Sequence, residues 1–187
     1  MTLVAPPNQS GLLHRADDQG SIGSGIWQRW FTSLWRSVTG LITDVSNLEY
    51  KSYCFVHKNG TDQSITAGAE TLITWATADY DTQSEVDLAN EKWVCGKTGV
   101  YDINITVQFG VAADGDRLRL TLYVGTTDTA QDSRTTGGGG AESLTIKTKL
   151  YLTAADELTF KAENLDNNDT IAGNSNRTFF SIYRLGD

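Results

Sequence analysis

The sequence predicts a mainly β fold, an antiparallel sandwich of two sheets that is preceded by an N-terminal arm and one helix. Three observations lead to this prediction. The 187 residues include 18 glycines but only two prolines, which is typical of turn-rich β structure. Residues 26–49 have helical spacing, and from about residue 50 onward short alternating runs are separated by Gly, Asn, Asp and Thr. The length suits one domain with a short appendage.

Residues 1–25 are predicted to form an anchoring arm. Both prolines and the loop-like run at residues 20–25 lie here, and the segment has no hydrophobic periodicity. We expect such an arm to be ordered only where something holds it. Residues 1–7 lack the basic start and the long apolar stretch of a signal peptide, so we expect a protein that works as a soluble molecule or as part of a soluble assembly.

Residues 26–49 are predicted to form one helix of a parallel coiled coil. Seven apolar residues alternate in steps of four and three, which is an unbroken heptad seam. A wider apolar stripe around the seam suits three or more strands, or a helix that also packs against another protein. The alternative is an amphipathic helix lying on its own β domain. The seam residues are Trp27, Phe31, Leu34, Val38, Leu41, Val45 and Leu48.

Residues 50–187 are predicted to form the head domain. Tyr101, Ile103 and Ile105 alternate with polar residues, as in antiparallel strands with one wet face. Eight short strands without intervening helices indicate a two-sheet sandwich such as a jelly roll. The predicted strands are residues 53–57, 71–75, 92–95, 100–109, 118–124, 144–152, 158–162 and 178–185.

Composition excludes several kinds of partner. The chain has 15 Lys and Arg against 23 Asp and Glu, a net charge of −8, which argues against binding to nucleic acid or to an anionic membrane. The most apolar window, residues 26–45, is interrupted by polar and charged residues, so we expect no membrane insertion. Two Cys and two His are too few for a structural zinc site, and Cys54 and Cys95 are expected to be reduced core thiols.

The head resembles the jelly-roll domain shared by complement collagen-like proteins and the tumour necrosis factor superfamily. The resemblance covers residues 70–185, and its most specific part is Lys92-Trp93-Val94-Cys95 followed by Gly99-Val100-Tyr101-Asp102-Ile103. Thr98, where a proline is common, and the glycines at 137–140 depart from the pattern. The resemblance implies a homotrimer. The predicted core residues of the head are Trp93, Gly99, Tyr101, Ile103, Leu120, Leu152, Phe160 and Phe180, with Gly99 in a turn that tolerates no side chain.

The helix resembles, more loosely, the N-terminal anchoring segments of small bacteriophage structural proteins. The similar residues are Trp27, Trp30, Phe31 and Leu34. The residues predicted to anchor the protein to a virion are Trp27, Trp30, Phe31 and Trp35. This resemblance implies a homotrimeric short fibre of the tail, neck or head, made in the host bacterial cytoplasm, whose outward head contacts a host surface glycan or protein. The alternatives are a capsid decoration or cement protein and a secreted glycan- or protein-recognition module.

No catalytic constellation is present in the sequence. His14 and His57 are not accompanied by a hydrolase or metalloprotease motif, so no enzyme and no cofactor is expected. The acidic loops are weak calcium candidates because they cluster the oxygen ligands that this ion prefers. Turns built on Asp and Asn explain the same loops without an ion. The calcium candidates are Asp114, Asp116, Asp166 and Asp169.

Overall fold

The computed structural model describes the backbone of residues 22–187 and the side chains of residues 27–42 and 50–187. The chain divides into two units, residues 1–50 and 51–187. The first contains helix α1 (Ile22–Glu49), which begins four residues before the predicted start. Gly23 and Gly25 each weaken a helix by about 1 kcal/mol relative to Ala, but extending an existing helix adds one hydrogen bond for each residue fixed. The predicted end of the arm at residue 25 therefore lies inside the helix.

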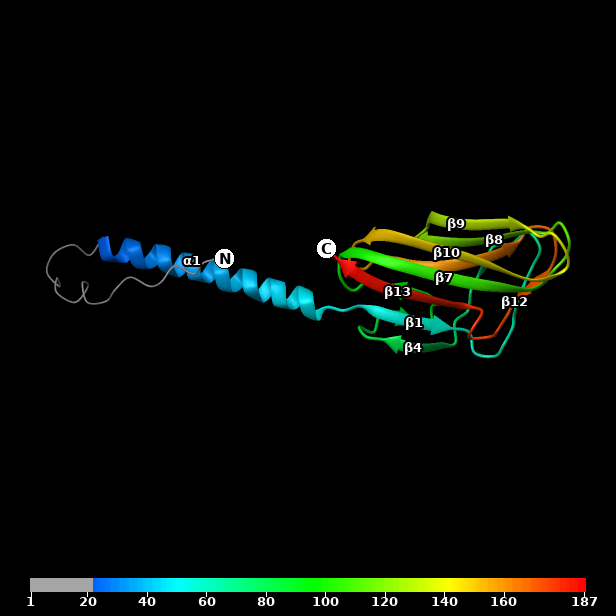
Figure 1. Ribbon diagram of the computed structural model, residues 1–187, viewed down its shortest axis with the longest axis horizontal. Helices are drawn as coiled ribbons and strands as arrows, with labels where there is room; N and C mark the ends of the chain where they lie inside the picture. Colours follow the sequence, from blue (N-terminus) through cyan, green and yellow to red (C-terminus); the bar gives the residue numbers. More distant parts are fainter. Residues whose placement is uncertain (1–21) are drawn as a thin grey trace. The chain divides into compact units, whose positions relative to one another are not determined.

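The second unit is an antiparallel sandwich of two sheets, which confirms the predicted fold class (Figure 1). The seven-stranded sheet has the order β2-β12-β7-β13-β1-β4, with β10 also paired to β7. Its strands are β1 (Tyr53–His57), β2 (Gln63–Ile65), β4 (Thr77–Asp81), β7 (Gly99–Ala112), β10 (Gly140–Leu152), β12 (Asp169–Ile171) and β13 (Phe179–Gly186).

The other sheet has six strands, in the order β5-β6-β11-β8-β9 with β3 also paired to β11. Its strands are β3 (Thr71–Leu72), β5 (Val86–Asp87), β6 (Lys92–Val94), β8 (Arg117–Val124), β9 (Thr127–Thr135) and β11 (Glu157–Asn164).

The strand predictions differ from the structure in two ways. The strand predicted at residues 71–75 ends at Leu72, although Ile73 and Trp75 still bury their side chains in the core. Strands β2, β4, β5, β9 and β12 were not predicted. Four of them have five residues or fewer, and β9 is a polar strand at the edge of its sheet that lacks an apolar face. Such strands are too short or too polar to show an alternation of apolar and polar residues, so this pattern cannot predict them.

The core fills the space between the two sheets. Along β7 the odd-numbered residues from Tyr101 to Phe109 are fully buried, whereas their neighbours are partly exposed. The ring of Tyr101 meets that of Trp93 edge to face at 5.2 Å, and the ring of Phe180 lies 4.9 Å from that of Phe160. The sandwich is therefore closed by aromatic contacts between strands of different sheets.

Gly99 is the first residue of β7, not a turn residue as predicted. A side chain is nevertheless excluded there, because an added Cβ would lie 2.3 Å from the carbonyl oxygen of Gly186. The requirement comes from the close approach of β13 to β7. Two residues later the Tyr101 hydroxyl donates a 2.5 Å hydrogen bond to the carbonyl oxygen of Lys97, which ties the start of the strand to the preceding loop.

Candidate self-association surfaces

Helix α1 presents an apolar stripe to solvent. Of the predicted seam, Phe31 is 57% exposed and Leu41 is 64% exposed. Beside them, Trp35 and Ile42 are 72% and 63% exposed. Contiguous exposed apolar surface of this kind marks an interaction site. Trp27 and Leu34 are half-buried, Val38 is exposed, and the side chains of Val45 and Leu48 lie outside the described residues.

Three of the four predicted anchoring residues form one ring cluster on α1. The ring of Trp30 meets those of Trp27 and Phe31 edge to face, at 5.7 and 5.0 Å between centroids. The fourth residue, Trp35, lies one turn beyond Phe31, and the described ring contacts do not include it. Each such ring carries about 150–250 Å² of surface that can be buried. The cluster therefore offers a large contact area within little more than one turn of helix.

On the polar side of α1, two threonine hydroxyl groups form hydrogen bonds within the helix. The Thr32 hydroxyl donates to the carbonyl oxygen of Gln28 at 2.7 Å, and the Thr39 hydroxyl donates to that of Trp35 at 2.8 Å. These bonds satisfy both hydroxyl groups within the helix. The apolar stripe is thus the side of the helix that gains most from contact with another protein.

The outward face of the seven-stranded sheet carries a second apolar surface, which sequence reasoning did not find. Tyr53 and Phe55 of β1 alternate with buried Cys54 and Val56, so their rings point away from the core. Neighbouring strands add further rings on the same face. The ring contacts join Tyr53 to Tyr80 at 5.9 Å, Tyr53 to Tyr183 at 6.4 Å, and Phe55 to Phe179 at 5.5 Å. We call these five residues the aromatic half of the face.

The same face becomes polar toward β7 and β10, which lie beyond β13 in Figure 1. Asp102 is opposite Lys149 in the register, and Asn104 is opposite Lys147. We call these four residues the charged half. The face therefore has two chemically different halves on neighbouring strands. In a symmetric dimer the two copies contact each other through the same patch, whereas in a ring of three or more copies each contact joins two different patches. A face with two different halves therefore suits a ring.

The predicted core residues of the head lie together between the sheets. Gly99 lies at their edge, against Gly186. Each of the remaining side chains is at most 1% exposed; they are Trp93, Tyr101, Ile103, Leu120, Leu152, Phe160 and Phe180.

The four calcium candidates do not form one cluster. Asp116 is buried and accepts hydrogen bonds from the side chains of Asn164 and Asn167 at 2.9 and 2.6 Å, which lowers its pKa. Asp166 pairs with Arg117, which lowers the pKa of Asp166. Within residues 22–187, as far as their side chains are described, no three acidic, His or Cys side chains are grouped to hold a metal ion.

Asp114 and Asp169 complete the set of calcium candidates. Asp114 is exposed, whereas Asp169 is buried and accepts hydrogen bonds from the backbone amides of Val111 and Thr170 through one oxygen. The two residues thus have different surroundings, and the contacts of Asp169 are to the backbone of its own strand and of β7.

The reactive residue types of the head are engaged in the fold. His57 is buried at the end of β1, where its Nδ1 lies 2.9 Å from the carbonyl oxygen of Lys58 and its Nε2 lies 3.2 Å from Asp79 Oδ1. Burial raises the pKa of the Cys54 and Cys95 thiols, so both remain protonated at neutral pH. His14 lies outside the described residues. No described helix is both long and apolar enough to cross a membrane.

The sequence matches no protein-family model and no curated protein. Its fold is similar to solved structures of the tumour necrosis factor type. Eiger TNF from S. frugiperda has a TM-score of 0.59 at 15% identity, over 73% of this chain and 94% of that one. Murine APRIL has a TM-score of 0.57 at 14% identity, over 72% and 99%. At these identities the likeness shows the fold, and the jelly-roll assignment rests on it.

Proposed function

We propose that this protein is a non-enzymatic structural protein that assembles as a homotrimer through α1 and the outward face of its seven-stranded sheet. The observation that carries the proposal is the exposed apolar stripe of α1, on which Phe31, Trp35, Leu41 and Ile42 are each more than half exposed. The occupant is a second and third copy of the same helix, because the stripe follows a heptad seam.

Two features favour three copies over two. The stripe is wider than a two-stranded seam, since Trp35 and Ile42 each directly follow a seam residue. The head adds the aromatic half of its sheet face, which a ring of copies would bury against a neighbour. The resemblance of the head to trimeric jelly-roll domains supports the same number.

We further propose that the trimer is a short fibre of a bacteriophage particle, on its tail, neck or head. The arm and the first turns of α1 attach it to other virion proteins, and the β head faces outward, where it is available to a host surface. The ring cluster of Trp27, Trp30 and Phe31 supports this role, because large aromatic residues dominate contact energies at protein interfaces. A capsid decoration protein is the second candidate, and it differs in using its head for docking.

The first experiment measures the mass of the full-length protein in solution by sedimentation. We expect three times the chain mass of 20.4 kDa. Leu34→Asp should shift the mass toward the monomer, because each copy would bury an unpaired charge in the coiled coil, at a cost of several kcal/mol. Arg36→Ala, on the polar side of the helix, is the matched control and should leave the mass unchanged. A stable wild-type monomer at micromolar concentration would overturn the trimer.

The second experiment tests attachment. A protein that lacks residues 1–35 is added to particles made without the protein, and the bound fraction is measured by co-sedimentation. We expect the truncated protein to melt cooperatively, because its core is formed within residues 51–187, and to fail to bind. Binding at the level of the full-length protein would show that the head docks, in favour of the capsid decoration role.

A further inference from the structure

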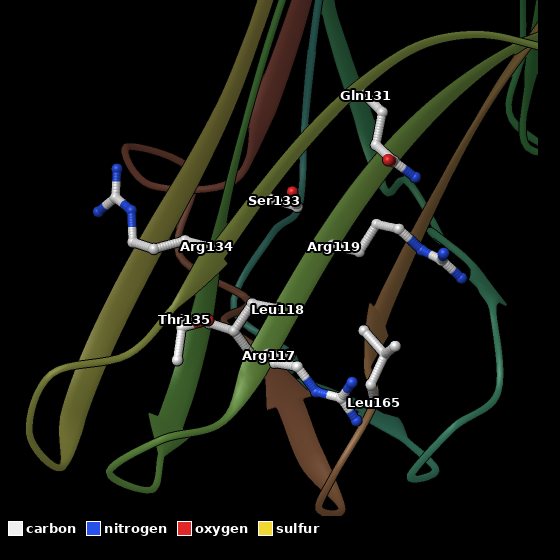
Figure 2. Close-up of a pocket in the computed structure, with 8 residues that line it drawn as sticks. All are labelled: Arg117, Leu118, Arg119, Gln131, Ser133, Arg134, Thr135 and Leu165. Carbon is white, nitrogen blue, oxygen red and sulfur yellow. The ribbon is translucent and has the colours of Figure 1, made fainter.

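The outward face of the six-stranded sheet contains a hollow of about 290 Å³ between β8 and β9. This volume is close to the lower end of the range for small-molecule sites, about 300–1,000 Å³. In Figure 2 the side chain of Arg134 points away from those of Arg117 and Arg119. The lining residues that matter here are Arg117, Arg119, Gln131, Ser133, Thr135 and Leu165.

The strand register brings these polar groups onto one face. Arg117 is opposite Thr135, and Arg119 is opposite Ser133. Gln131 is opposite Thr121 in the next row, and its amide donates to the Thr121 hydroxyl at 3.4 Å. Two guanidinium groups, two hydroxyls and one amide therefore line a single hollow. Together they supply both hydrogen-bond donors and acceptors.

The guanidinium groups of the hollow are fixed and electrically balanced. Arg117 donates from Nε and Nη2 to the two carboxylate oxygens of Asp166, at 3.1 and 2.9 Å. Arg119 donates from Nη2 to Glu163 and lies 3.8 Å from Glu70. Lys161 lies 3.6 Å from Glu70, so three cationic side chains face the three carboxylates, and the whole chain carries a net charge of −8. An anion would find directed donors here without a net positive charge to attract it.

The loop beside the hollow is held in place by its own hydrogen bonds. The Leu165 amide donates to the carbonyl oxygen of Arg117 at 2.9 Å, and the Asp166 amide donates to Asn164 Oδ1 at 3.0 Å. The Asn164 side chain in turn donates to buried Asp116. The arrangement of the hollow is thus formed before any ligand binds, which lowers the entropy cost of binding.

We propose that this hollow binds a neutral sugar ring. A sugar hydroxyl both donates and accepts a hydrogen bond, so it suits a wall that mixes guanidinium donors with hydroxyl and amide groups and has no net charge. Leu165 supplies an apolar contact for the C–H groups of the ring. The site lies outside the self-association surfaces. It would give the outward head of the proposed fibre a carbohydrate to bind, but the chemistry of the hollow does not depend on trimer formation.

The test is saturation-transfer NMR on the full-length protein with glucose, galactose, mannose and N-acetylglucosamine as separate probes. We expect at least one to bind with a dissociation constant in the millimolar range. Ser133→Trp, which fills the hollow, should weaken binding by at least about tenfold. Thr129→Trp is the matched control on the same edge strand, outside the lining, and should bind as the wild type does. Arg117→Lys keeps the charge but loses the planar fork, so it should also weaken binding.

Three outcomes would overturn the proposal. None of the four sugars binds, or N-acetylneuraminate binds in their place, which would make the hollow an anion site. Alternatively, Ser133→Trp and Thr129→Trp bind a sugar equally well, which would put the sugar elsewhere. The sedimentation mass of each variant is measured in parallel. A monomer that binds sugar would contradict the trimer alone, and a trimer that binds none would contradict the sugar site alone.

Discussion

One outward face of the sandwich carries aromatic rings, whereas the other carries ion pairs. On the seven-stranded sheet, the aromatic half gathers five rings around Tyr53 and Phe55. On the six-stranded sheet, Arg117, Arg119 and Lys161 each lie within 4 Å of a carboxylate. Burial of aromatic rings stabilises an interface, whereas burial of ion pairs costs free energy because the charges lose their hydration. The first face therefore suits the proposed assembly, and the second suits the proposed sugar site.

The largest effect is expected in the core between the two sheets. Tyr101→Ala should lower the free energy of unfolding by about 3–5 kcal/mol, because it leaves a cavity beside Trp93. Tyr101→Phe keeps the ring but removes the bond of the hydroxyl to Lys97, and it should cost about 1 kcal/mol. Urea unfolding of both variants gives the two values. An unfolding midpoint of the Ala variant equal to that of the wild type would contradict the inward position of this ring.

The next effect concerns assembly through the aromatic half. Tyr183→Asp should weaken association by on the order of 3 kcal/mol per contact, because the carboxylate would be buried without a partner in the interface. Thr129→Asp, on the exposed edge strand of the other sheet, is the control and should leave association unchanged. Sedimentation at several protein concentrations measures both. If the two variants dissociate to the same extent, the two outward faces do not differ in the way described here.

A smaller effect is expected for the ion pairs of the six-stranded sheet. The Glu163 side chain is 7% exposed and pairs with Arg119, so Glu163→Gln should cost about 1–3 kcal/mol of folding stability. Glu142→Gln, in β10 of the other sheet, breaks a more exposed pair with Arg134 of β9 and should cost less than about 1 kcal/mol. Chemical unfolding separates the two. Equal costs would show that burial does not distinguish these pairs.

The smallest effect is a dependence on acid. Hydrogen bonds from Asn164 and Asn167 lower the pKa of Asp116 in the folded chain. The stability that this carboxylate contributes is therefore present above the unfolded pKa, about 3.9, and is lost as the pH falls through the lower folded value. Asp116→Asn should flatten the fall in stability below pH 4 relative to the wild type. Unfolding midpoints measured from pH 6 to pH 2 check this difference.

Some of these features could be predicted from the sequence and others could not. The helix seam from Trp27 to Leu41 is visible because one period governs the whole segment. The core of β7 is visible because Tyr101, Ile103 and Ile105 alternate with polar residues. The fold class follows from patterns of this kind. In each case the two sides of the element have different polarity.

The aromatic half and the hollow could not be found in this way. In β1 the run Tyr53-Cys54-Phe55-Val56 is apolar on both sides, so the sequence does not say which residues face outward. Which of these side chains face outward depends on the pairing of β1 with β13 and β4. The hollow needs β9, which has no apolar side, and the loop at Leu165, which is far along the chain. Their proximity comes from strand register, which local patterns do not contain.

Strand β13 is hydrogen-bonded between β7 and β1, and Tyr53 pairs with Tyr183 near the other end of the chain. During synthesis β1 and β7 are therefore complete long before the strand that joins them, and each has an open edge in the meantime. Open edges pair readily with other chains, and contacts between distant parts of a sequence form slowly. The yield of folded protein should thus depend on temperature and on chaperones during translation more strongly than its final stability would suggest.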